Sequence, residues 1–366
     1  MDIPKIYVSA TRQNDGKTTA SLGLLNVIAE HYPKIGYIKP VGQQVKLIGD
    51  KEIDKDASLM HEVYHIGDQL YDMSPVAIPK GFTESYIRNG EVSELQQKIQ
   101  TSFAKAANNK DFIVLEGTGH AGVGSVLDLS NAVVANLLKT PVIIVTCGGI
   151  GRPIDEVMLN KALFDAQGVE VLGVIINKVI PSKYDKINEI VRLGFKRKNL
   201  KVFGVIPFIP ILSSPTIRQI LEDCKGELLC GDTLLDEKVE KVIVGAMPAY
   251  TALDYFRGEV LLITPGNRED LIFAALTCNA QGIREECAVK GIILTCGVYP
   301  HHSILSMVEK SNIPTILVNE DTFTTAKKIN NLIIKIKPED TEKINTVKEM
   351  IKKYVDVDEI LGMIKP

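Results

Sequence analysis

Short apolar runs alternate with longer amphipathic stretches along the whole chain. In the first half the runs are continuously apolar, which is typical of parallel strands buried on both faces of a sheet. These expected strands are residues 5–9, 36–41, 112–116, 142–146, 171–176 and 202–206. The expected helices between them are residues 17–30, 57–65, 94–107 and 154–166. The alternation predicts an α/β fold with a parallel sheet and helices on both faces.

The pattern changes after Pro207. Residues 208–215 contain two prolines and two serines, which is typical of a linker. A second series of strands is expected at residues 242–244, 260–264, 291–295 and 315–318. We therefore predict one domain over residues 1–212 and a second, smaller α/β domain over 213–366. A fragment ending near Ser213 is expected to fold alone.

The first expected strand leads directly into a loop and a helix, and the sequence at this junction is Asp15-Gly16-Lys17-Thr18-Thr19. A strand, a loop ending in Gly-Lys-Thr and a helix form the phosphate-binding P-loop, whose amides surround the phosphates of ATP. We therefore expect Asp15, Gly16, Lys17, Thr18 and Thr19 to contact the nucleotide. Lys17 would add a positive charge there, and the Thr18 hydroxyl would bind Mg²⁺. The loop departs from the usual pattern, because Ala10 and Thr11 stand where its first glycine is sought.

Acidic and basic residues also follow two other expected strands. Glu116 begins the sequence Glu-Gly-Thr-Gly at the end of one strand. Lys39 lies at the end of the second expected strand, and Asp54 and Asp56 come after it. Open parallel sheets bind their ligands at the carboxyl ends of strands. We expect a carboxylate here to reach the Mg²⁺ held by Thr18, and Lys39 to face the transferred phosphoryl group.

These residues resemble, in order, dethiobiotin synthetase and the related ATP-dependent cobyrinate amidating enzymes. The matching segments are Gly16-Lys17-Thr18, Ala20-Ser21, Lys39-Pro40-Val41, Asp56-Ala57, Glu116-Gly117-Thr118-Gly119, residues 141–145, Asn177 and residues 204–207. The resemblance implies that Lys17 and Lys39 contact phosphates and that Thr18, Asp56 and Glu116 surround Mg²⁺. It implies that Asn177 and the backbone near Pro207 hold the adenine, and that the protein is a homodimer.

Enzymes of this class phosphorylate a small carboxylate or carbamate, and an amine then attacks the mixed anhydride. The substrate segments differ here, since residues 79–90 and 120–125 are not those of the synthetase, and Arg12 stands where related dimeric ATPases carry a lysine. A different acceptor is therefore expected.

The second half resembles a DRTGG domain over residues 244–247, 263–270, 293–297 and 318–322. The same pair of domains begins the long phosphotransacetylases, where it is thought to regulate, and this chain resembles a stand-alone version. Two hypotheses remain open. The protein is an ATP-dependent ligase, or it is a nucleotide-dependent regulator that senses a metabolite.

Composition adds few constraints. The formal net charge is −3, which gives no reason to expect a nucleic acid partner, and no apolar stretch is long enough to span a membrane. The chain opens without a secretory signal, and its six cysteines lack metal-type spacing, so we expect reduced thiols and a cytoplasmic location. His61-Glu-Val-Tyr-His65 matches a zinc-protease pattern, but we interpret it as a surface helix.

Overall fold

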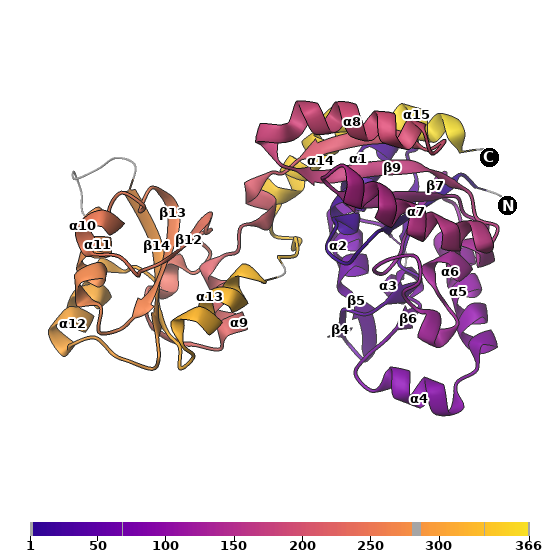
Figure 1. Ribbon diagram of the computed structural model, residues 1–366. Helices are drawn as coiled ribbons and strands as arrows, with labels where there is room; N and C mark the ends of the chain where they lie inside the picture. The colour runs from indigo at the N-terminus through magenta and orange to yellow at the C-terminus, as the bar shows by residue number, and fades with distance from the viewer. Residues whose placement is uncertain (1–2, 68, 280–286, 333, 365–366) are drawn as a thin grey trace. The chain divides into compact units, whose positions relative to one another are not determined.

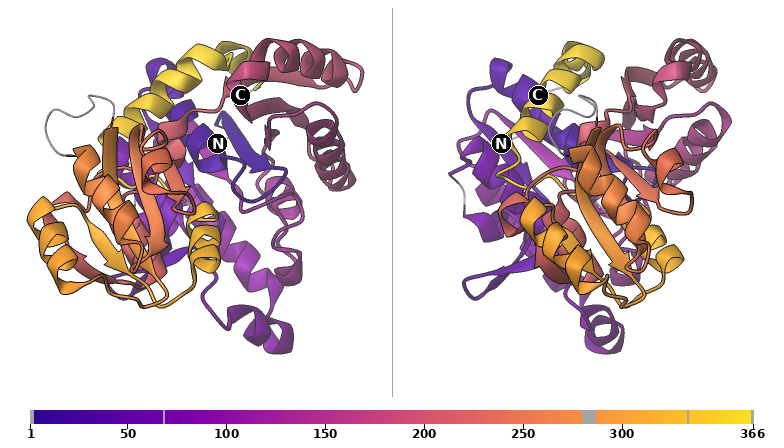
Figure 2. Two further views of the ribbon diagram at one scale, coloured as in Figure 1. Left: turned by 60° about the vertical axis from the view of Figure 1, so that its left-hand side comes forward. Right: turned by 90° about the vertical axis from the view of Figure 1, so that its left-hand side faces the viewer.

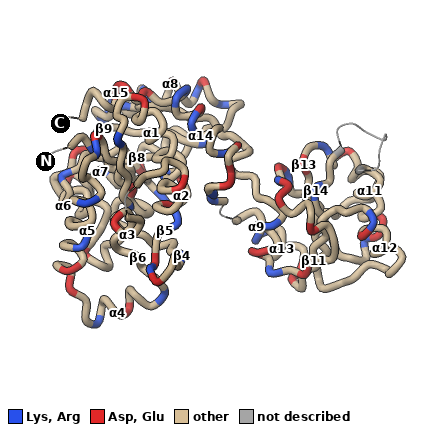
Figure 3. The backbone as a smooth tube through the Cα atoms, turned by 180° about the vertical axis from the view of Figure 1, so that it is seen from behind, with Lys and Arg blue, Asp and Glu red and all other residues tan. Residues whose placement is uncertain are grey.

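The computed structural model describes residues 3–67, 69–279, 287–332 and 334–364. The chain divides into two compact units (Figure 1). Unit 1 contains Met1–Ile209 and Ile336–Pro366, and unit 2 contains Pro210–Lys335. Lys and Arg residues are interspersed with Asp and Glu along the backbone of both units (Figure 3).

Unit 1 is built on a six-stranded sheet in the order β10-β9-β8-β1-β7-β2, and every neighbouring pair is parallel. The strands are β1 (Lys5–Ala10), β2 (Ile35–Ile38), β7 (Phe112–Glu116), β8 (Val142–Cys147), β9 (Val171–Val179) and β10 (Lys201–Pro207). All five residues of β7 are buried, as continuous apolar runs predict for central strands. The predicted α/β fold is confirmed.

Helices cover both faces of this sheet (Figure 1). They include α1 (Lys17–His31), α2 (Lys55–Tyr64), α5 (Val92–Ala106), α6 (Asn131–Leu137), α7 (Gly151–Ala166) and α8 (Tyr184–Lys196). Between β2 and α5 the chain also forms β3 (Val41–Gly42), the hairpin β4 (Val45–Ile48) and β5 (Lys51–Asp54), α3 (Leu70–Met73), β6 (Val76–Ala77) and α4 (Phe82–Asn89). The sequence pattern did not reveal these short elements.

The end of the chain belongs to unit 1, which corrects the predicted assignment of residues 213–366 to one domain. Helices α14 (Thr341–Tyr354) and α15 (Val357–Met363), drawn in yellow, both pack against α1 (Figures 1 and 2). A Cβ added at Gly23 of α1 would lie 2.1 Å from Ile351 Cγ1, so α14 packs directly on the backbone of α1. Periodicity identifies the apolar face of such a helix but not the distant surface that it covers.

Unit 2 has a five-stranded sheet in the order β11-β15-β14-β13-β12. The strands are β11 (Glu227–Cys230), β12 (Lys241–Val244), β13 (Gly258–Pro265), β14 (Cys287–Thr295) and β15 (Thr315–Leu317), of which only β11 is antiparallel to its neighbour. Its helices are α9 (Ile217–Cys224), α10 (Ala249–Ala252), α11 (Glu269–Asn279), α12 (His302–Ser311) and α13 (Thr322–Asn330). This unit is the predicted smaller α/β domain, without residues 336–366.

Two other sequence expectations concern cysteines and membranes. Cys147, Cys224, Cys230 and Cys296 are free thiols, but Cys278 is disulfide-bonded, contrary to the expectation that all six are reduced. Cysteine spacing alone does not reveal which side chains approach within bonding distance. None of the helices in the described residues combines the length and apolar character that crossing a bilayer requires.

Candidate functional site

The phosphate loop joins the end of β1 to the start of α1. Gly16 has φ of 100°, a left-handed conformation that favours glycine. A Cβ at this position would also lie only 2.2 Å from Asn177 Nδ2, which donates a hydrogen bond to the Asp15 carbonyl at 3.0 Å. Glycine at position 16 therefore lets the Asn177 side chain of β9 lie against the loop backbone and form this hydrogen bond.

At the start of α1, neither a capping side chain nor an acidic residue of the first turn balances the positive end of the helix dipole. Lys17 is only 8% exposed, and its ammonium has no hydrogen-bond acceptor or ion-pair partner among the residues that the structure describes. Burial, followed by the nearby charge of Lys39, lowers the pKa of Lys17 to about 8. Uncapped amides and an ammonium that no described side chain contacts directly together favour a bound anion.

Asp15 shapes the loop with its side chain. Its Oδ2 accepts hydrogen bonds from Thr11 Oγ1 at 2.7 Å and from the Arg12 amide at 2.8 Å. Its Oδ1 accepts one from Cys147 Sγ at 3.1 Å. The buried carboxylate of Asp15, a predicted nucleotide contact, is thus hydrogen-bonded within the protein.

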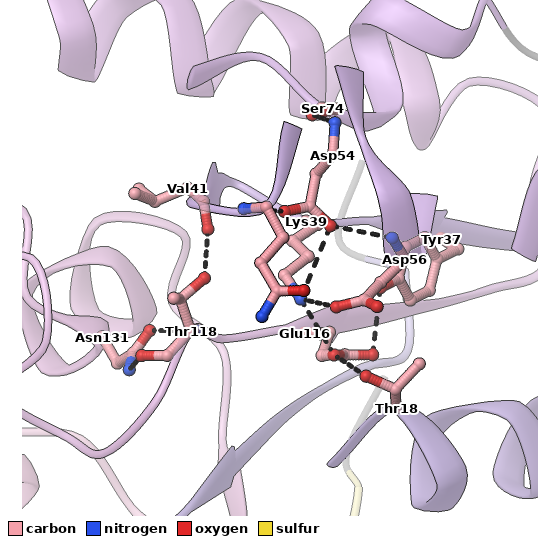
Figure 4. Close-up of polar contacts among 11 residues, drawn as sticks. Thr18, Tyr37, Lys39, Val41, Asp54, Asp56, Ser74, Glu116, Thr118 and Asn131 are labelled. Carbon is pink, nitrogen blue, oxygen red and sulfur yellow. Dashed lines mark hydrogen bonds and ion pairs between the residues drawn. The ribbon is translucent and has the colours of Figure 1, made fainter. Parts of the chain in front are cut away.

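A second cluster, the lysine–carboxylate cluster, consists of Lys39, Asp54, Asp56 and Glu116 (Figure 4). All four side chains are buried. Lys39 Nζ donates to Asp56 Oδ2 and, at 3.1 Å, to Glu116 Oε1, and lies 3.7 Å from Asp54 Oδ1. Burial alone lowers the pKa of Lys39, but the three carboxylates outweigh burial and raise this pKa well above its ordinary value.

Glu116 connects the lysine–carboxylate cluster to the phosphate loop. Thr18 Oγ1 donates to Glu116 Oε1 at 2.9 Å, and the Tyr37 hydroxyl donates to Oε2 at 3.0 Å. Burial and, after it, the charge of Glu116 raise the pKa of Tyr37 well above its ordinary value, so this hydroxyl remains a donor. The β1–β7 pairing, which sets Val8 opposite Glu116, brings the two motifs together.

The chemistry of these donors fits a magnesium ion. Within the described part of the chain, no group of three or more His, Cys, Asp or Glu could hold a metal alone. Mg²⁺ in nucleotide sites needs fewer protein ligands, because one or two carboxylates bind it together with phosphate oxygens and waters. Thr18, Asp56 and Glu116 supply hard oxygen donors.

The other predicted nucleotide residues lie at the same edge of the sheet. Thr19 is in the first turn of α1, Asn177 is in β9, and Pro207 ends the neighbouring β10. Asn177 uses both ends of its amide within the protein, since its Oδ1 accepts from the Lys178 amide at 2.9 Å. It is thus a support of the loop in this structure.

Two residues were missed in the sequence. Tyr37 precedes Lys39 by two positions, and this spacing, which places two side chains on the same face of a strand, was the available signal. Asn131 supports the Glu116 segment, because its Nδ2 donates to the Thr118 carbonyl at 2.7 Å and its Oδ1 accepts from the Thr118 amide at 3.1 Å. Its position in α6, distant from any motif, gave no signal.

The zinc-like pattern does not lie on one continuous helix. His61 is within α2, but His65 follows its last residue and has a left-handed backbone with φ of 50°. The two imidazoles therefore lack the shared helical face that a pair of zinc ligands separated by four residues requires.

Comparison with known proteins agrees with this architecture. A family described as an AAA domain matches residues 4–216, which is more than half of the chain. The chain belongs to this AAA-domain family. A DRTGG domain matches residues 219–332, within unit 2. The two matches confirm the predicted pairing of a P-loop domain with a DRTGG domain.

Curated relatives resemble the chain across both domains. Phosphate acetyltransferase of Nitratidesulfovibrio vulgaris is 26% identical over 364 residues, covering 97% of this chain and 51% of the relative. The Synechocystis enzyme is 26% identical over 370 residues, covering 98% and 52%. The chain thus spans about half the length of the curated relatives it matches.

Solved structures with similar folds are more distant. The septum site-determining protein MinD of Pyrococcus horikoshii, complexed with Mg-ADP, covers 58% of this chain and 84% of its own, with 17% identity and a TM-score of 0.36. The match to the CBS and DRTGG domains of Clostridium perfringens pyrophosphatase, complexed with diadenosine tetraphosphate, covers 44% of this chain and 80% of that one. The identity is 19% and the TM-score is 0.26.

Proposed function

We propose that unit 1 binds Mg-ATP at the phosphate loop and transfers the terminal phosphoryl group to a small carboxylate or carbamate, as a step of ligation or amidation. The observation that carries this proposal is the buried ammonium of Lys17, which has no hydrogen-bond or ion-pair partner among the described residues, beside the hydrogen bond from Thr18 to Glu116. A buried cation without a partner is costly unless a ligand supplies the opposite charge. The phosphates of ATP do so.

Each residue then has a defined task. The α1 amides and Lys17 bind phosphate oxygens, while Thr18, Asp56 and Glu116 would hold Mg²⁺, which neutralises phosphate charge when bound. Lys39 is kept cationic by its carboxylates and would face the developing charge. A carboxylate oxygen of the acceptor attacks the γ-phosphorus of ATP. The bond between the γ-phosphorus and the oxygen that bridges it to the β-phosphate breaks, which gives ADP and an acyl phosphate. An amine then attacks the acyl carbon and releases phosphate.

The nucleotide part of the proposal is tested with Lys17→Ala. We expect Mg-ATP affinity in calorimetric titration to fall at least about tenfold, while the circular dichroism spectrum is unchanged. Lys196→Ala, which removes an exposed lysine at the end of α8, is the matched control and should bind as the natural protein does. Equal affinity of Lys17→Ala and the natural protein would refute the site.

The transfer part needs an acceptor. Small carboxylates can be screened, each together with ammonia, for stimulated ADP release. An acceptor that stimulates ADP release is then labelled with oxygen-18 in its carboxylate. It should pass one labelled oxygen to the released phosphate, because the acyl–oxygen bond breaks in the second step. Phosphate free of the label would exclude an acyl phosphate on that acceptor.

A second candidate function is a nucleotide-dependent regulator. It is favoured by similarity to phosphate acetyltransferases that runs through both domains rather than the P-loop domain alone. A ligand of unit 2 would then change ATP affinity in the intact chain, and ATP would change the affinity for that ligand by the same factor. Titrating ATP with and without adenine nucleotides or phosphorylated metabolites distinguishes the two functions. A regulator shows this reciprocity without consuming an acceptor.

A further inference from the structure

Two arginines beside the phosphate loop converge on a single carboxylate oxygen. Arg12, in the loop, and Arg152, in the first turn of α7, both form ion pairs with Glu156 Oε1, and the Arg152 Nε distance is 2.7 Å. Glu156 lies one turn after Arg152 on the same helix. The side chains of Arg12 and Arg152 are 53% and 66% exposed, against 18% for Glu156. The two guanidinium groups therefore meet at the surface with their remaining donors accessible.

The cations around this pair outnumber the carboxylates near them. Arg12 and Arg152 share Glu156, and Lys178 Nζ, which donates to the Asn14 carbonyl at 2.7 Å, adds a third positive charge. Asp15 is a second carboxylate nearby and its charge favours the Arg152 guanidinium, but it accepts hydrogen bonds from Thr11, the Arg12 amide and Cys147 rather than from either guanidinium. Like charges brought together repel, and an anion between them would relieve the repulsion.

The position of the pair relates it to the phosphate site. Arg12 belongs to the same loop as Lys17, and Arg152 follows the carboxyl end of β8, the strand next to β1. Ligands of parallel sheets bind at this edge. A planar guanidinium with several donors matches a carboxylate or a phosphate group in two-point hydrogen bonding. The proposed function requires an acceptor with an anionic group close to the phosphate loop.

We propose that Arg12 and Arg152 form a subsite for an anionic group of the acceptor, carboxylate or phosphate, and that Glu156 holds the two arginines together until the acceptor replaces it as their partner. The subsite rests on the proposed function for the identity of its ligand. Its existence as an anion site is independent of that function.

The test uses the full chain saturated with Mg²⁺ and a non-hydrolysable ATP analogue, so that the phosphate loop is filled. Inorganic phosphate and acetate are titrated separately by calorimetry, which distinguishes the two sources of anionic charge. Arg152→Ala should weaken binding of the preferred anion about fivefold or more. Glu156→Gln should bind it at least as tightly as the natural protein, since a competing carboxylate is removed. Arg218→Ala, which removes an exposed arginine of unit 2 that is paired with Asp236, should change nothing.

Three results would overturn the proposal: no binding of either anion to the natural protein, unchanged affinity in Arg152→Ala, or a loss in Glu156→Gln as large as in Arg152→Ala. Repeating the titration without nucleotide in a Lys17→Ala background separates the subsite from the proposed function. Suppose that the natural protein binds no nucleotide while Arg152→Ala still weakens anion binding in the Lys17→Ala background. In that case the anion site stands and the ATP-dependent function fails.

Discussion

The packing of α14 on α1 predicts that residues near the end of the chain stabilise the domain that begins it. Ile351 is fully buried against the backbone of α1 at Gly23. Ile351→Ala removes three carbon atoms from this contact, and such a deletion in a closed core costs about 2–5 kcal/mol. That is a large share of the roughly 5–15 kcal/mol that stabilises an ordinary domain. Leu193→Ala, on an exposed face of α8, is the matched control and should cost less than about 0.5 kcal/mol.

The assay combines urea unfolding followed by circular dichroism with hydrogen exchange read on peptides of α1. We expect Ile351→Ala to lower the unfolding midpoint and to speed exchange within residues 17–31. Gly23→Ala should destabilise the natural chain by about 1–3 kcal/mol, because its Cβ would overlap Ile351. The same change should cost less in the Ile351→Ala background, where Cγ1 is absent, and the two changes should couple by at least about 0.5 kcal/mol.

Two results would refute this reasoning. One is unchanged α1 exchange in Ile351→Ala, and the other is simple additivity of the two substitutions. The same packing revises the expectation that a fragment ending near Ser213 folds alone. Such a fragment lacks α14 and α15 and exposes the apolar face of α1, so we now expect it to be unstable. Joining residues 1–209 to residues 336–366 through a flexible linker should restore folding and Mg-ATP binding.

Three further predictions concern the site. Glu116→Gln should weaken the Mg²⁺ dependence of ATP binding while sparing much of the metal-free binding, which titration with and without Mg²⁺ will check. Because burial lowers the pKa of free Lys17 to about 8 and bound phosphate favours its ammonium, Mg-ATP affinity should hold below pH 8 and fall about tenfold between pH 7 and pH 9. Calorimetry in two buffers should show proton uptake at pH 9, and Lys17→Ala should show none. Protein purified without chelator should contain far less than one zinc per chain, and replacing His61 and His65 by alanine should leave ATP binding intact; stoichiometric zinc that this double variant loses would contradict the prediction.

The sequence by itself determined the features that depend on local pattern. Continuous apolar runs located the six strands of the first sheet, since a strand buried on both faces has no polar side. Gly16-Lys17-Thr18 between a strand and a helix located the phosphate loop, and acids after other strands indicated where its partners would come from. In the structure Thr18 contacts Glu116, and Lys39 contacts both Asp56 and Glu116.

Tertiary structure alone decided which distant surfaces meet. Gly23 and Ile351 are in contact although more than three hundred residues separate them. Because of such packing, the last two helices of the chain belong to unit 1. The hydrogen bond from Tyr37 to Glu116 and the ion pair between Arg12 and Glu156 are likewise contacts between separate elements. Periodicity reports which face of an element is apolar, whereas the partner of that face is chosen by packing the whole chain at once.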